Sequence, residues 1–61
     1  MVMIYKVSKN GTTVLTTLFY KDAAKRYDEC IYNGQPGDII RMEVKKTGNE
    51  PKWELARKDW L

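Results

Sequence analysis

Apolar and polar residues alternate with a period of two near both ends of the chain, which is the pattern of half-buried β-strands. In the N-terminal part, residues 5–9 and 12–18 are rich in β-branched and apolar side chains, and Asn10-Gly11 lies between them. Both turn residues tolerate a positive φ, so this dipeptide is a strong signal for a two-residue β-hairpin. The turn predicts the pairs Lys9–Thr12, Val7–Val14, Tyr5–Thr16 and Met3–Leu18.

This predicted register sorts the side chains of the first hairpin onto two faces. One face carries Tyr5 and Val7 and is expected to meet the core. The other carries Ile4, Leu15 and Phe19, which makes it more apolar than a solvated face requires. We therefore expect an exposed apolar cluster on the side of the sheet that faces away from the core.

From Asp22 onward the apolar period changes to 3.6 residues, which predicts an amphipathic helix of about three turns. Asp22 is the expected N-cap, and Asn33-Gly34 is the expected C-terminal stop. Residues 35–38 cannot continue the helix and are expected to turn the chain into the next strand. The apolar stripe consists of Ala23, Ala24, Tyr27, Cys30 and Ile31.

A second hairpin is predicted from residues 39–46 and 51–58, joined by a loop over residues 47–50. Alternation places Ile40, Met42 and Val44 inward, and the loop length pairs Val44 with Trp53 and Met42 with Leu55. The chain is thus expected to form one α+β domain over residues 1–61. Its order is ββαββ: a four-stranded antiparallel sheet of two hairpins with one helix packed on one face. The other face of the sheet is left open.

The residue types that the chain contains limit the kinds of functional site that it can form. The 61 residues include no histidine and one cysteine, so the commonest general base and the commonest metal ligand are missing. Cys30 lies on the apolar stripe, where a thiol acts as a small hydrophobe. We predict a protein that is not an enzyme and needs no cofactor or metal. The apolar start, residues 1–5, is too short for a membrane span, so we expect a cytoplasmic protein without membrane association.

The exposed apolar cluster favours a protein-binding function. Exposed apolar patches and aromatic anchors are typical of protein–protein contacts. We expect Ile4, Leu15, Phe19 and the near-terminal Trp60 to contact a larger protein. Cationic residues on the same face would steer the chain toward an acidic partner, and they are Arg41, Lys45 and Arg57. Two alternatives remain: Trp60 folds back as a lid over Ile4 and Phe19, or the same face joins a homodimer.

The net charge of +3 keeps nucleic acid as an alternative partner. Basic residues gather on the second hairpin, and the candidates are Lys45, Lys46, Lys52, Arg57 and Lys58. A basic sheet face that carries aromatic side chains binds single strands in several small folds. Two observations oppose this: glutamates interrupt the basic patch, and the predicted register leaves no aromatic on the outward positions of the last two strands.

The layout resembles a group of small bacteriophage proteins. The chain has a strand, the Asn10-Gly11 turn, a strand ending in Leu18-Phe19-Tyr20, the helical sequence of residues 22–30 and then the segment of residues 37–44. This order is similar to that of the single-domain accessory proteins that tailed phages encode. The resemblance implies a stoichiometric binder that inhibits or redirects a host protein such as a polymerase, a nuclease or a defence factor. The resemblance assigns no site residues in this chain.

Overall fold

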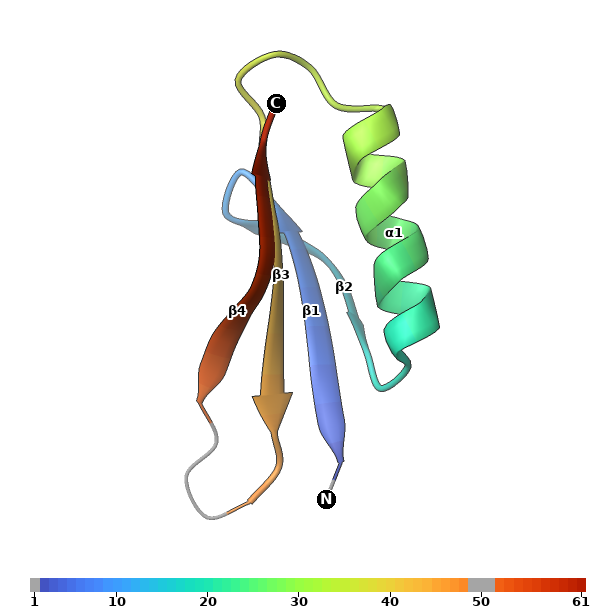
Figure 1. The fold of residues 1–61 in the computed structure, drawn as a ribbon, viewed down its shortest axis with the longest axis vertical. Coiled ribbons are helices and arrows are strands. Elements are labelled where there is room, and N and C mark those ends of the chain that lie inside the picture. Colours follow the sequence, from blue (N-terminus) through green and yellow to red (C-terminus); the bar gives the residue numbers. More distant parts are fainter. Residues whose placement is uncertain (1, 49–51) are drawn as a thin grey trace.

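The computed structural model describes residues 2–48 and 52–61, which form four strands and one helix. The elements are β1 (Met3–Lys9), β2 (Thr12–Thr17), α1 (Tyr20–Tyr32), β3 (Ile39–Lys46) and β4 (Trp53–Trp60). The strands pair antiparallel in the order β2-β1-β3-β4, and α1 lies across one face of the sheet (Figure 1). The predicted α+β class and ββαββ order are confirmed.

The Asn10-Gly11 turn forms as predicted and also fastens the first hairpin to β3. Asn10 has a φ of 52° and Gly11 a φ of 83°, which is the positive region that the tight turn requires. The Asn10 N–H donates to the Ile39 carbonyl at 2.8 Å, and its side-chain oxygen accepts from the Ile39 N–H at 2.9 Å. The Asn10 amide also donates to the Asp38 carboxylate, which lowers the pKa of Asp38.

The predicted register of the first hairpin is wrong beyond its second pair. Lys9–Thr12 and Ser8–Thr13 pair, but a β-bulge follows and Val7 lies opposite Leu15. One extra residue on β2 shifts every later side chain to the other face. Leu15 therefore packs against the core on the helix side and not on the open side where the sequence placed it. The predicted pairs Tyr5–Thr16 and Met3–Leu18 are also wrong, since Tyr5 pairs with Thr17, the last residue of β2.

The N-cap residue of helix α1 lies three residues before the predicted cap, Asp22. Phe19 is the N-cap residue, with φ −110° and ψ 119°, and no side chain caps the first turn. Asp22 lies within that turn, where its negative charge interacts favourably with the helix dipole. The predicted end at Asn33 is confirmed. Gly34 follows because a Cβ there would overlap the side chain of Leu61 and approach the Cys30 carbonyl oxygen to 2.8 Å.

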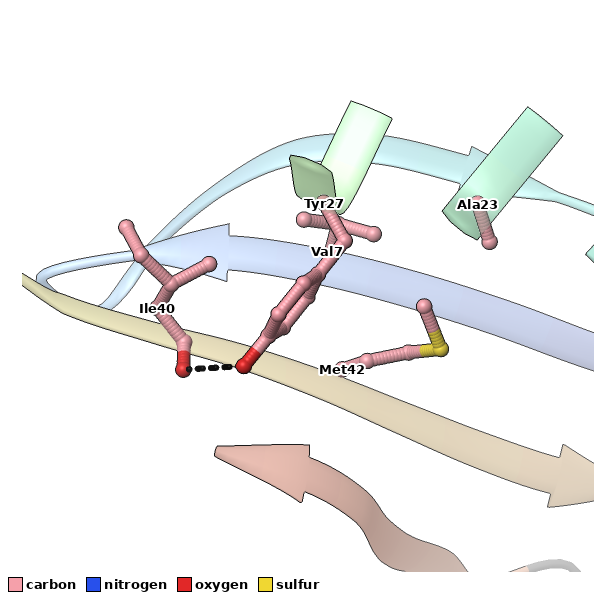
Figure 2. Packing of buried hydrophobic residues seen from close by; sticks show 5 residues of the cluster. All are labelled: Val7, Ala23, Tyr27, Ile40 and Met42. Atoms are coloured by element: carbon pink, nitrogen blue, oxygen red, sulfur yellow. Dashed lines mark hydrogen bonds between the residues drawn. The ribbon is translucent and has the colours of Figure 1, made fainter. Parts of the chain in front are cut away.

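The core lies between α1 and the central strands and is centred on Tyr27. Tyr27, Ala23, Val7 and Ile40 are fully buried, and Met42 is nearly so (Figure 2). The Tyr27 hydroxyl lies 2.5 Å from the Asp59 carboxylate and 3.3 Å from the Ile40 carbonyl oxygen. Burial, and then the hydrogen bond to Asp59, raise the pKa of Tyr27 well above its usual value. The hydroxyl therefore stays a protonated donor at physiological pH.

The predicted register of the second hairpin is also wrong. Trp53 lies opposite Lys45 and Leu55 opposite Glu43, one residue away from the predicted register, and a second bulge then leaves Ala56 unpaired. Trp53 and Leu55 therefore turn away from the helix instead of inward. The physical reason is that α1 packs mainly on β1, β2 and β3 and meets β4 through Arg57 and Asp59, beyond the positions of Trp53 and Leu55.

Arg57 turns toward the helix, whereas the sequence placed it on the open side. Its guanidinium lies 4.5 Å from the Tyr27 ring centroid and pairs with Asp28 of α1 at 3.8 Å. It also lies 3.3 Å from Asp59, which accepts the Tyr27 hydrogen bond. These contacts fasten β4 to α1, so Arg57 stabilises the fold from the helix side.

Candidate functional site

The face of the sheet that carries no helix is the open face. Its residues follow from the register, because successive side chains of a strand point to opposite faces. Three of them form one row across the sheet: Ile4 of β1, Lys45 of β3 and Trp53 of β4. The open face comprises Ile4, Lys6, Ser8, Thr13, Thr16, Ile39, Arg41, Glu43, Lys45, Trp53, Leu55, Lys58 and Trp60.

The open face concentrates the positive charge of the chain. It carries four cationic side chains and one carboxylate, that of Glu43, which together give +3. The whole chain also has a net charge of +3, so the charged residues elsewhere balance one another. A surface with one excess sign attracts ligands of the opposite charge from solution. The four cations are Lys6, Arg41, Lys45 and Lys58.

Trp53 anchors a cationic cluster at one end of the open face. The Lys6 Nζ lies 4.3 Å from its ring centroid and the Lys45 Nζ lies 4.9 Å from it. Both distances are within the range of a cation–π interaction. Lys6 also pairs with Glu43 at 3.8 Å, so Lys45 supplies the less compensated charge of this cluster.

Trp60 lies at the opposite end of the open face and is exposed. It pairs with Ile39 at the start of β3, and 76% of its surface is accessible. Leu55, between the two tryptophans on β4, is 54% exposed. The two tryptophans of the chain thus share one face, and both are outward on the last strand. The prediction that the last strand has no outward aromatic side chain, which opposed nucleic-acid binding, is therefore wrong.

The residues predicted to bind a protein do not form one surface. Ile4, Arg41, Lys45 and Trp60 lie on the open face, while Leu15 and Arg57 lie on the helix side. Phe19, at the N-terminus of α1, is 66% exposed. The lid alternative is wrong because Trp60 is held opposite Ile39, far along β3 from Lys45, the partner of Ile4.

The residues predicted to bind nucleic acid also do not form one surface. Lys45 and Lys58 lie on the open face, whereas Lys46 lies opposite Met3 on the helix side. Lys52 is exposed just before β4, and Arg57 faces α1.

Sequence reasoning missed Lys6 and Trp53 as site residues. Lys6 lies two residues after Ile4 along β1, and this spacing places both on the open face, but Lys6 was not named as a site residue. Trp53 could not be placed there from its spacing, since the bulge at Ala56 leaves no distinct pattern in the sequence.

A second exposed surface lies at the junction of β2 and α1. Leu18 and Phe19 in the connection are 55% and 66% exposed. Tyr20, which is 58% exposed, contacts Tyr5 edge to face with ring centroids 5.6 Å apart. The nearby start of β1 adds two more exposed side chains. We call this surface the apolar tip; its residues are Val2, Met3, Leu18, Phe19 and Tyr20.

Cys30 lies on the buried side of α1, as its position in the apolar stripe predicts. It is partly buried, packs against the core and lines a shallow pocket with Arg26 and Glu29. Its contacts with the core are those of a small hydrophobic side chain.

Comparison of the chain with protein-family models, curated proteins and solved structures finds no match. Across residues 2–48 and 52–61, no helix is long and apolar enough to cross a membrane.

Proposed function

We propose that this chain binds single-stranded nucleic acid on the open face. The observation that carries the proposal is the coincidence of the net charge of +3 and both tryptophans on one face of the sheet. Cationic side chains attract phosphates, and exposed aromatic rings stack on unpaired bases. The sequence favoured a protein partner, but its strongest objection to nucleic acid depended on the incorrect register of β4.

The exposed Trp60 favours a single strand over a duplex as the ligand. Stacking on an aromatic side chain requires a base whose face is free, and a duplex buries these faces between neighbouring pairs. The four cations of the open face contact phosphates of either form, so they do not discriminate. We expect tighter binding to an unpaired strand than to a duplex of the same composition.

The affinity for a single strand is expected to fall steeply with salt. Each neutralised phosphate contributes about 0.7 to the negative slope of log affinity against log salt, so four cations predict a slope of about −2 to −3. Tryptophan fluorescence of the intact chain, titrated with an oligothymidylate of about twelve nucleotides, measures this slope. Titrations at about 50 and about 200 mM salt span the necessary range.

Two variants locate the binding on the open face. Lys45→Gln removes a cation from it, and Lys25→Gln removes the same charge from the exposed surface of α1. We expect only Lys45→Gln to weaken binding and make the salt slope shallower. Equal effects of the two variants, or no binding by the unmodified chain at low salt, would contradict the proposal.

A protein-binding module is the second candidate function, and the apolar tip is the observation that favours it. Leu18 and Phe19 are exposed side by side, as in anchors of protein–protein contacts. A phage origin, a host target and homodimerisation stay predictions from the sequence. If no single strand binds, the apolar tip becomes the surface to test next, with Phe19→Ser as the disruptive variant.

A further inference from the structure

The two tryptophans of the open face have different surroundings. Trp53 is partly buried, and two lysine ammonium groups lie within 5 Å of its ring centroid. Trp60 is 76% exposed. A base can stack only on a ring whose face it can reach.

The lysines at Trp53 are already placed to receive a phosphate. A lysine side chain has several rotatable bonds, and much of its rotamer entropy is lost when its ammonium group is fixed on a ligand. The indole of Trp53 contacts the ammonium groups of both Lys6 and Lys45 before any ligand arrives, and Lys6 also pairs with Glu43 at 3.8 Å. This arrangement reduces the entropy lost on binding a phosphate.

We propose that Trp53 positions Lys6 and Lys45 as a phosphate clamp, while Trp60 is the platform on which a base stacks. This inference depends on the proposed binding of single strands and assigns separate roles within that site. The chemical group recognised at Trp53 is a phosphodiester, and the group recognised at Trp60 is an unpaired base. Trp53 acts through the two lysines and is therefore a positioning residue.

The distance between the two subsites sets the length of strand that occupies both. Trp53 lies opposite Lys45 and Trp60 opposite Ile39, six residues apart along β3. At about 3.3 Å per residue this separation is about 20 Å. A stacked strand that rises about 3.4 Å per nucleotide covers it with about six nucleotides. Affinity is expected to rise with strand length up to about this size.

Single-tryptophan variants separate the two roles by fluorescence. Trp53→Phe leaves Trp60 as the reporter, and Trp60→Phe leaves Trp53. With an oligothymidylate of about twelve nucleotides, we expect strong quenching of Trp60 and weak quenching of Trp53. Equal quenching would overturn the assignment, because both rings would then stack on bases.

The salt dependence separates the two roles by affinity. We expect Trp60→Leu to weaken binding about tenfold and leave the salt slope unchanged, because a stacking contact carries no charge. We expect Trp53→Leu to weaken binding and make the slope shallower, and Trp53→Phe, which keeps a ring under the lysines, to restore both. Tyr32→Leu is the control for loss of an exposed aromatic, since Tyr32 is 90% exposed on α1.

The possible results distinguish this inference from the proposed function. If the unmodified chain binds but Trp60→Leu binds equally well, the assignment of Trp60 is wrong and the proposed function stands. If Trp53→Leu leaves the salt slope unchanged while it remains folded by circular dichroism, the clamp is wrong. If the unmodified chain binds no oligothymidylate, both proposals are overturned.

Discussion

Tyr27→Ala is expected to unfold the domain. Tyr27 is fully buried at the centre of the core, and removal of a large aromatic side chain from such a site costs about 3–5 kcal/mol. A chain of this length has a total stability of about 3–9 kcal/mol, so the loss is comparable to the whole. The substitution also removes the hydrogen-bond donor to Asp59 and the ring beneath Arg57, which together fasten β4 to α1.

Urea denaturation followed by circular dichroism measures this effect, with Tyr27→Phe as the matched variant. Phenylalanine keeps the ring and loses only the hydroxyl, and Asp59 retains its contact with Arg57. We expect Tyr27→Phe to remain folded with a loss of about 1.5 kcal/mol. A cooperative transition of Tyr27→Ala within about 1 kcal/mol of the unmodified chain would show that the core does not depend on this residue.

Reversal of two charges on the open face is expected to abolish most single-strand binding. Lys45→Glu with Lys58→Glu removes two cations from the face and adds two anions, which changes the net charge of the chain from +3 to −1. We expect the affinity for an oligothymidylate to fall about 100-fold at about 50 mM salt, because phosphate contacts become repulsions. The fold should tolerate the change, since Lys58 lies opposite Arg41 and a glutamate there gains an opposite charge.

The matched control for this reversal is Lys21→Glu with Lys25→Glu. Both lysines are exposed on α1, and the substitution gives the same net charge of −1. Any effect of overall charge is therefore common to the two double variants, and the difference between them reports the open face alone. Similar losses of affinity in both would contradict binding at the open face.

The turns and the elements of this fold could be predicted from short stretches of sequence. Asn10-Gly11 predicts its turn because few residues adopt positive φ at two successive positions. The helix is predicted because its apolar residues repeat every three or four positions, and Ala23 and Tyr27 are indeed buried. The turn and the helix are determined by residues that are close together in the sequence, so the sequence alone is enough to predict them.

The faces of the outer strands could not be predicted, because two bulges reverse them. One extra residue in β2 turns Leu15 inward, and another at Ala56 turns Trp53 and Leu55 outward. A bulge is fixed by tertiary contacts: β4 is held by the contacts of Arg57 and Asp59 with Tyr27, a residue about thirty positions away. Trp53 was missing from the candidate site for this reason, since it lies on the part of β4 whose face was predicted wrongly.

The most direct test of the central claim is an NMR titration of the isotope-labelled chain with unlabelled oligothymidylate. We predict that the indole N–H signals of Trp53 and Trp60 and the amide signals of Lys6, Arg41 and Lys45 shift with increasing ligand. Amides on the solvent side of α1 should remain unchanged. Shifts confined to α1 or to the apolar tip, with both indole signals unmoved, would contradict the claim that the open face binds single strands.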